Sequence, residues 1–228
     1  MSAPASDTDT KEIPEATVLF AGDSGDGMQV TGSQFTLASA YAHNDLATLP
    51  DYPAEIRAPA GTTFGVSAFQ LHFGASEVRT PGEKVDLLVA MNAAALKVHL
   101  HRVRPGGTII ANVDAFEEKD LKKADLDSNP LTDGTLDEHQ VQEVPLTTIT
   151  REELSDTDLS VQEIDRSKNM VALGLALWMY DRPVEPAQEW IETKFDDQPA
   201  IRDANLRVLK KGYHYGETVE AFAVQYEV

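Results

Sequence analysis

The feature that constrains the fold most is a strand, a glycine-rich turn and a helix that follow one another near the start of the chain. Residues 18–21 form a short apolar run, which ends in Gly-Asp-Ser-Gly-Asp-Gly at 22–27. Small or apolar residues then recur every three or four positions, as on one face of a helix: Met28, Thr31, Phe35, Ala38 and Ala42. We expect Asp26 to cap this helix, with Gln29 three residues later as in a capping box. A strand–turn–helix unit of this kind is typical of the opening of a βαβ fold.

The rest of the chain continues the alternation of strand-like and helical segments. Strands are expected at 46–50, 64–73, 85–91, 108–113 and 141–149, and helices at 93–103, 168–180, 186–195 and 199–211. Helix 168–180 is apolar nearly all round, which places it in the core or in a subunit contact. The sequence therefore predicts an α/β fold: an open, mostly parallel, Rossmann-like sheet with helices on both faces and a helical C-terminal extension.

The two ends of the chain carry weaker signals. Residues 1–15 are expected to be a disordered lead-in, and residues 16–212 the folded domain. Residues 213–228 show no clear closing element and are expected to be a tail or linker. Within the domain, the sequence Arg-Pro-Gly-Gly at 104–107 should stop the helix that begins at residue 93.

Composition excludes several classes of protein. The 228 residues contain no cysteine, so a disulfide framework and a cysteine-ligated Fe–S cluster are excluded in this chain. The formal net charge of −19 disfavours binding to nucleic acid or to an anionic membrane. No run of 18 apolar residues could span a membrane, and the polar, acidic start does not look like a signal peptide, so a cytoplasmic location is expected. The six histidines are scattered, and no metal site is predicted.

The glycine-rich turn is the first candidate binding element, through Gly22, Ser24, Gly25 and Gly27. Backbone N–H groups at a helix N-terminus can hold a phosphate. The spacing is G-x-x-G-x-G, however, which differs from the G-x-G-x-x-G of dinucleotide-binding folds. Asp23 and Asp26 also place negative charge where a pyrophosphate would lie. The alternative is a purely structural turn that lets the helix approach the sheet.

A loop rich in proline, alanine and glycine, at 52–62, is the second candidate. Its lone Arg57 could pair with a carboxylate or phosphate, and Gly61 and Thr62 lie on the same loop. Loops that follow strand C-termini line the ligand crevice of an open α/β sheet, so this loop should face the glycine-rich turn. The alternative for Arg57 is a local contact with Glu55.

Several other polar and aromatic residues could have either a structural or a functional role. Asn92 follows the strand 85–91 and could donate to a ligand, although a helix cap is favoured. The charged segment 165–169 could fix the start of the apolar helix or meet a partner subunit. Trp178 and Trp190 are expected to be core residues. No Ser/His/Asp arrangement or pair of carboxylates stands out, so no catalytic residue is predicted.

Together these motifs resemble the γ domain of 2-oxoacid:ferredoxin oxidoreductases. The resemblance covers roughly residues 16–218 and lies in the segments 20–28, 52–62, 85–92, 104–108, 169–182 and 212–217. The Glu-Ile-Arg-Ala-Pro-Ala-Gly-Thr loop is similar to that of bacterial 2-oxoglutarate enzymes, in which the γ domain is fused in front of a thiamine-binding α domain.

The resemblance implies a part of an enzyme that is inactive alone. The complete enzyme would oxidise a 2-oxoacid to acyl-CoA and CO₂ and pass electrons to ferredoxin. Thiamine diphosphate, Mg²⁺ and Fe–S clusters would belong to partner α and β domains or subunits. The γ domain would contribute to coenzyme A binding, with Arg57 pairing with an anionic group and the N–H groups near Ser24 and Gly25 in weaker contact. Thiamine enzymes hold Mg²⁺ with Gly-Asp-Gly and a later asparagine pair, and residues 49–56 contain no asparagine.

Two alternative functions remain open from the sequence. One is a nucleotide-binding oxidoreductase domain with its own dinucleotide, against which the glycine spacing argues. The other is a non-catalytic interaction module, with which the apolar helix 168–180 is compatible.

Overall fold

The computed structural model describes residues 9–55, 58–218 and 224–228. Its centre is a six-stranded sheet with the strand order β3-β4-β2-β5-β6-β7. β4 is antiparallel to both of its neighbours, while the β2–β5, β5–β6 and β6–β7 pairs are parallel. The strands are β2 (Glu15–Asp23), β3 (Asp45–Asp51), β4 (Val66–Gly74), β5 (Val85–Ala90), β6 (Val103–Asn112) and β7 (Gln140–Val144). The predicted mostly parallel sheet is therefore confirmed.

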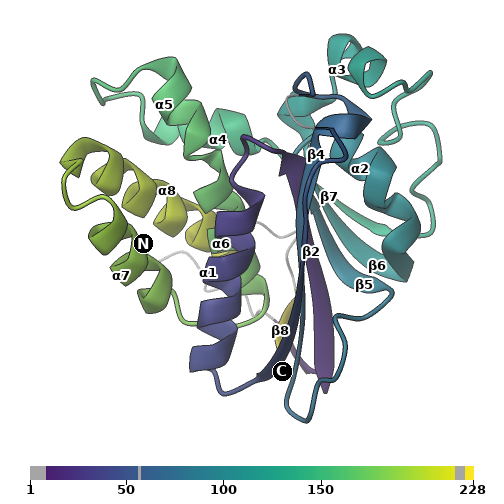
Figure 1. Ribbon diagram of the computed structural model, residues 1–228, viewed down its shortest axis with the longest axis horizontal. Helices are drawn as coiled ribbons and strands as arrows, with labels where there is room; N and C mark the ends of the chain where they lie inside the picture. The colour runs from purple at the N-terminus through teal and green to yellow at the C-terminus, as the bar shows by residue number, and fades with distance from the viewer. Residues whose placement is uncertain (1–8, 56–57, 219–223) are drawn as a thin grey trace, which may run out of the picture.

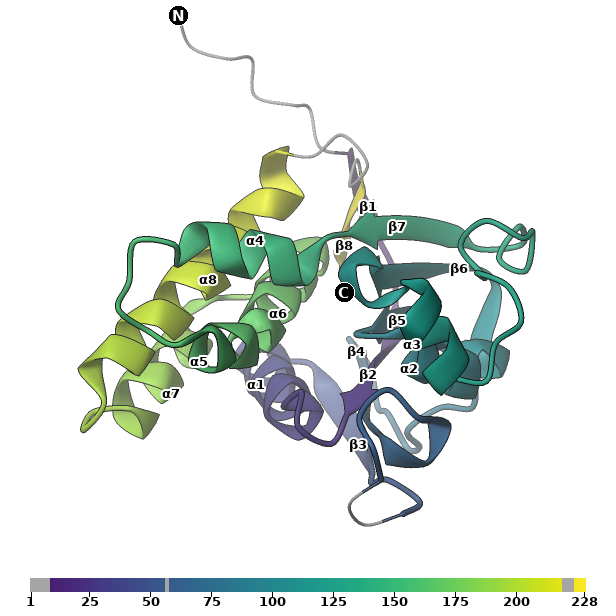
Figure 2. The same ribbon diagram turned by 90° about the horizontal axis from the view of Figure 1, so that it is seen from above.

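Helices cover both faces of the sheet, as predicted. α1 and α4 to α8 lie on one face, and α2 and α3 lie on the other (Figure 1 and Figure 2). The helices are α1 (Met28–Tyr41), α2 (Ala93–His99), α3 (Glu118–Lys123), α4 (Leu146–Glu153), α5 (Val161–Arg166), α6 (Lys168–Met179), α7 (Glu185–Lys194) and α8 (Pro199–Thr218). Short 3₁₀ turns occupy Thr63–Gly65, Leu100–Arg102 and Val113–Ala115. No helix in the described ranges is long and apolar enough to cross a membrane.

The sheet separates two hydrophobic cores because successive side chains of a strand point to opposite faces. On β2, Val18 and Phe20 face the larger core, while Leu19 and Ala21 face the smaller one. Phe35 of α1 lies at the centre of the larger core, with ring centroids 5.6 Å from both Phe20 and Phe73. The periodicity that predicted α1 thus reflects the burial of one helix face on the sheet.

α6 is a core helix and crosses α8 with the two backbones in contact. A Cβ atom added at Gly174 would lie 2.1 Å from the carbonyl oxygen of Leu209, and one added at Gly212 would lie 2.1 Å from that of Val171. Eleven residues of α6 are buried, Asn169–Met179. Of the two places expected for the apolar helix, the core is therefore the one observed.

The region after α2 differs from the prediction. α2 ends at His99, and residues 104–107 belong to β6 instead of stopping a helix. Val103 pairs with Val85 and Thr108 with Leu87, so residues 104–107 bulge out opposite the single residue Asp86. Arg104 Nη1 lies 2.5 Å from Asp86 Oδ1, which gives the one charge of an otherwise apolar strand a partner.

Both ends of the chain are more ordered than predicted. The expected disordered lead-in is wrong for β1 (Asp9–Glu12), and the expected tail contains the end of α8 and β8 (Val224–Glu227). β1 and β8 form a separate, parallel two-stranded sheet. The predicted strand 141–149 likewise ends at Val144, since α4 begins at Leu146. The division at 15 and 212 into domain and flanking segments stays a prediction.

Candidate functional site

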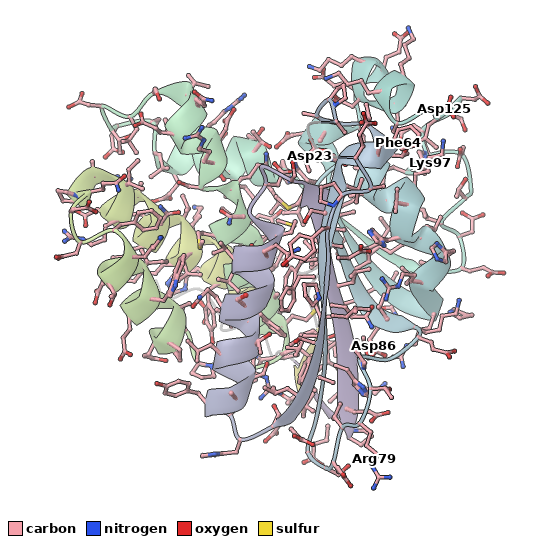
Figure 3. All side chains as sticks on the ribbon, viewed as in Figure 1. Asp23, Phe64, Arg79, Asp86, Lys97 and Asp125 are labelled. Carbon is pink, nitrogen blue, oxygen red and sulfur yellow. The ribbon has the colours of Figure 1, made fainter. Side chains whose placement is uncertain are left out.

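The candidate site lies at the carboxyl ends of β2, β5 and β6. The connections that leave β2 and β5 pass to opposite faces of the sheet, through α1 and α2, so these adjacent strands form a topological switch point. Ligands of open α/β sheets bind in the crevice at such a point. Figure 3 shows Asp23 and Phe64 at this upper end of the sheet, with Asp86 lower down.

The glycines of the turn that follows β2 have different roles. A Cβ at Gly22 would lie 2.9 Å from both Asp26 Oδ2 and Met91 Cβ, so the close approach of the turn to β5 requires glycine there. Gly27 has φ 74° and is the N-cap of α1, which corrects the prediction that Asp26 caps this helix. A Cβ at Gly25 would meet nothing within 4 Å. The structural explanation therefore accounts for Gly22 and Gly27, but not for Gly25.

Asp23 ties the glycine-rich turn to the proline-rich loop. The Gly61 N–H donates to both carboxylate oxygens of Asp23, at 3.0 and 2.9 Å. The Ser24 N–H donates to the carbonyl of Gly65 at 3.2 Å. The expectation that loop and turn face each other is confirmed. Burial raises the pKa of Asp23 above its usual range, and the Gly61 hydrogen bond offsets this only in part.

Asp26 is paired on both of its carboxylate oxygens. Oδ1 lies 2.7 Å from Lys168 Nζ at the start of α6, and Oδ2 accepts a hydrogen bond from the Asp23 N–H at 2.9 Å. The two side chains are largely buried, with 12% of Asp26 and 21% of Lys168 exposed. The negative charge of Asp26 is thus compensated from a distant part of the sequence.

Two adjoining cavities surround these residues. The larger, about 650 Å³, lies between the turn, the loop and α5, and the smaller, about 140 Å³, lies over the ends of β5 and β6. Both are bordered by Asp23, Asp26, Ala60 and Lys168. Two further cations line them: Arg166 the larger one, and Lys123 the smaller one. The exposed Gly25 lies at the larger cavity, and no hydrogen-bond acceptor for its N–H occurs among the described residues.

The structure brings together some of the predicted site residues. Ser24 and Gly25 line the larger cavity, while Gly61 and Asn92 line the smaller one. Gly22, Gly27 and Thr62 line neither. Asn92 accepts a hydrogen bond from the Ala95 N–H at 2.8 Å, so its predicted role as a helix cap is confirmed. Arg57 lies outside the described residues.

One atom of the predicted site needs correction. The Ser24 N–H was expected to contact an anionic group, but it is already bonded to Gly65 within the protein. Gly25 and Ser24 both line the cavity, and of these two residues only Gly25 has an N–H without an acceptor among the described residues.

The main residues missed as site residues come from the second half of the chain. Gln162, Asp165, Arg166 and Lys168 border the larger cavity, and Asn112 and Thr147 border the smaller one. The charged segment before the apolar helix indicated a possible contact site. Its position beside the glycine-rich turn, however, depends on the packing of α6 against α1. Asp165 itself is engaged by Arg151, with Oδ1 2.7 Å from Nε.

Comparison with known families and proteins gives concordant results. Residues 17–215 match the family described as pyruvate ferredoxin/flavodoxin oxidoreductase. The 2-oxoglutarate oxidoreductase subunit KorA of Mycobacterium tuberculosis is 46% identical over 220 residues, which are 96% of this chain and 34% of that protein. The chain therefore spans about a third of the length of this curated relative.

Solved structures share the fold at low sequence identity. The 2-oxoglutarate:ferredoxin oxidoreductase of Magnetococcus marinus, solved with 2-oxoglutarate, coenzyme A and succinyl-CoA bound, superposes with a TM-score of 0.69 at 20% identity, over 91% of this chain and 32% of that one. The γ subunit of a keto/oxoacid ferredoxin oxidoreductase of Geobacter sulfurreducens gives 0.57 at 16% identity, over 87% and 99%. The pyruvate oxidoreductase subunit PORC of Thermotoga maritima gives 0.56 at 18% identity, over 89% and 97%.

Proposed function

Because the chain belongs to the pyruvate ferredoxin/flavodoxin oxidoreductase family, we propose that it is the γ-type part of a thiamine-dependent 2-oxoglutarate:ferredoxin oxidoreductase. The 46% identity to KorA supports 2-oxoglutarate as the 2-oxoacid. In this proposal the chain helps to bind coenzyme A and to assemble the enzyme, in the cytoplasm. The thiamine-binding and cluster-bearing parts, and the contact with ferredoxin, belong to partner domains or subunits.

The single observation that carries the coenzyme A role is the cationic side of the larger cavity. Arg166, Lys168 and Gly25 line it, and the N–H of Gly25 has no hydrogen-bond acceptor among the described residues. A pyrophosphate needs this combination of cations and backbone donors. The carboxylates of the lining oppose an anion less than their number suggests, because Asp26 is paired with Lys168, Asp165 with Arg151, and Asp23 accepts two bonds from Gly61. Since Asp26 compensates the charge of Lys168, Arg166 supplies the attraction to an anion and Lys168 adds hydrogen-bond donors.

Thiamine diphosphate and its Mg²⁺ do not fit the same turn. Asp26 is the only carboxylate in Gly25-Asp26-Gly27, and both of its oxygens are engaged by Lys168 and the Asp23 N–H. Within residues 9–55, 58–218 and 224–228, no group of three His, Asp or Glu side chains could hold a metal ion. We therefore assign the thiamine site to a partner.

The chain's own contribution to the reaction is then binding and orientation. Thiamine diphosphate, when bound in the partner, supplies the carbanion chemistry that decarboxylates the 2-oxoacid. Arg166, Lys168 and Gly25 would hold the pyrophosphate and so fix where the thiol end of coenzyme A reaches. Fixing the acceptor in this way lowers the entropy cost of the acyl transfer. Arg57 stays a predicted phosphate contact, and its neighbour Ala58 lines the same cavity.

The proposed function is tested by assembly and activity. The chain purified by itself should show no 2-oxoglutarate-dependent dye reduction, because no described residue provides a redox centre or a thiamine site. A tagged chain expressed in its native host should co-purify with thiamine- and cluster-containing polypeptides that reduce the dye in a coenzyme A-dependent way. Robust activity of the chain alone, or a preparation without such partners, would contradict the proposal.

Gly25→Ala should raise the KM for coenzyme A roughly tenfold in the assembled enzyme. The added methyl group would stand in the cavity beside the N–H that faces the phosphate, and losing one charge-assisted hydrogen bond costs about 1.5 kcal/mol. The melting temperature should hardly change, because the position has free space around it and no positive φ. Steady-state kinetics with coenzyme A varied would measure the effect, and an unchanged KM would remove the turn from the site.

A further inference from the structure

A second groove opens on the helical side of Arg166. It has a volume of about 320 Å³ and lies between α1, the α5–α6 junction, α7 and the start of α8. Arg166 borders both this groove and the larger cavity, so the two adjoin along that side chain. We call it the Trp190 groove, after the half-buried tryptophan of α7 that lines it.

The lining of the Trp190 groove is aromatic and apolar at its base. Trp190 contacts Phe195 edge to face, with ring centroids 6.1 Å apart, and Val30, Met170 and Ile201 complete the apolar surface. A tryptophan beside open space provides a platform on which a flat ring can stack. Unlike Trp178, which is 3% exposed and part of the core, Trp190 is available for such a contact.

A few polar groups converge on this apolar surface. Ser167, Asn169 and Asn205 line the groove and are buried, with 3%, 5% and 5% of each residue exposed. The Ser167 hydroxyl and the Asn205 amide nitrogen already donate to the carbonyls of Glu163 and Ile201, at 3.5 and 2.8 Å, so these two residues offer acceptor oxygens. The Asn169 amide offers both a donor and an acceptor. An apolar pocket with a small number of placed polar groups is the usual form of a small-molecule site, and the volume lies within the range of such sites.

The rim of the groove carries positive charge. Lys194 and Arg166 both border it, and both are exposed residues. Glu163 borders it as well, but its Oε2 already accepts hydrogen bonds from the Ser160 N–H at 2.8 Å and the Ser160 hydroxyl at 2.6 Å. A ligand that matches this groove therefore combines a flat, hydrogen-bonding ring with an anionic group. A nucleotide base with a phosphate on its ribose has this chemistry.

We propose that the Trp190 groove binds the adenosine 3′-phosphate end of coenzyme A, with the adenine ring stacked on Trp190 and the 3′-phosphate near Lys194. This assignment rests on the proposed function. The pyrophosphate would then pass Arg166 into the larger cavity, and the pantetheine arm would leave from there toward the partner domain. Because Arg166 borders both cavities, a ligand that occupies the two of them would pass this side chain.

The test compares coenzyme A, 3′-dephospho-coenzyme A and pantetheine as acyl acceptors of the assembled enzyme. Trp190→Ala should lower the preference for coenzyme A over pantetheine, as a ratio of kcat/KM, roughly tenfold, since stacking of a base on an aromatic side chain is commonly of this size. Trp190→Phe should retain most of that preference. Lys194→Gln should reduce the preference for coenzyme A over its 3′-dephospho form, and Lys194→Arg should keep it. Glu189→Ala is the matched control on the same helix, because Glu189 does not line the groove.

The outcomes separate this assignment from the proposed function. If wild-type enzyme turns over with coenzyme A and Gly25→Ala raises its KM, but Trp190→Ala leaves the acceptor preference unchanged, the adenine assignment fails alone. If wild-type enzyme shows no coenzyme A-dependent turnover, both fail. Dissociation of the complex by Trp190→Ala, seen by gel filtration, would instead identify a partner side chain as the occupant and overturn the proposal.

Discussion

Gly212→Ala is expected to lower the free energy of unfolding by more than about 3 kcal/mol, which is a large loss for a single methyl group. The new Cβ would lie 2.1 Å from the carbonyl oxygen of Val171 and 2.8 Å from two other backbone atoms of that residue. Side-chain rotation cannot relieve a clash with backbone, so α6 and α8 would have to move apart by more than 1 Å and lose contacts along their crossing. For a chain of this length the melting temperature should fall by about 10 °C.

Gly25→Ala is the matched control for this experiment. It makes the same chemical change at a glycine with nothing within 4 Å of the added atom, and it should leave thermal melting unchanged. Melting followed by circular dichroism on both variants would measure the difference. If Gly212→Ala melts within about 2 °C of wild type, the backbone contact between α6 and α8 is not as close as described.

Lys168→Met should lower both the free energy of unfolding and the affinity of the proposed coenzyme A site. It leaves Asp26 without its cation beside Asp23, in a pair that is less exposed than a surface salt bridge but not fully buried. Exposed pairs contribute up to about 1 kcal/mol, and breaking buried pairs costs about 3–5 kcal/mol, so a loss of about 2 kcal/mol is expected. Removing a cation from the cavity should also raise the KM for coenzyme A at least roughly tenfold.

A second substitution separates the two effects of Lys168→Met. The double variant Asp26→Asn with Lys168→Met removes the unpaired carboxylate and keeps an oxygen that accepts the Asp23 N–H, so most of the stability should return. The KM for coenzyme A should stay high, because the cation is still absent. Recovery of both properties together would show that Lys168 acts only through the fold.

The loss of stability in Lys168→Met should depend on pH. The pKa of Asp23 is raised in the folded protein, mainly by burial and also by the charge of Asp26. An acid with a raised folded-state pKa opposes folding once it is ionised, and this penalty grows as the pH rises from the unfolded value near 3.8 through the folded value. Lys168 lowers the pKa of Asp23, so its removal makes this penalty larger in the variant than in wild type. The difference in melting temperature between wild type and Lys168→Met should therefore shrink as the pH is lowered from 7 toward 4.

The parts of the fold that were predicted correctly depend on local patterns. The β2–turn–α1 unit, the apolar helix α6 and the Asn92 cap each follow from residues that lie within one or two turns of one another. The antiparallel direction of β4 could not be predicted from such local patterns. The alternation of side chains along a strand is the same in either direction, and only the pairing with neighbouring strands decides which direction the strand takes. The bulge at 104–107 was missed for a similar reason, since it is defined by the register against β5.

Only the part of the candidate site that is formed by the glycine-rich turn and the loop after β3 could be predicted from the sequence. The turn and the loop after β3 were found because the ends of β-strands are marked by glycine and proline. Lys168 pairs with Asp26 from the far end of the domain, and that contact exists only once α6 has packed on α1. Arg166 and Trp190 likewise become cavity residues through helix packing. From the sequence alone, Arg166 cannot be distinguished from an ordinary surface residue, nor Trp190 from an ordinary core residue.

The small sheet of β1 and β8 should form late in the folding of the chain. Asp9 pairs with Val224 and Glu12 with Glu227, so almost the whole chain lies in the loop that this pairing closes. Closing so long a loop from an unfolded chain costs entropy that four short residue pairs cannot repay. The pairing can therefore form only after the central sheet and the helices have already brought the ends together. In native-state hydrogen exchange, the amides of β8 should open ahead of those of β5, which makes this pair a reporter of completed folding.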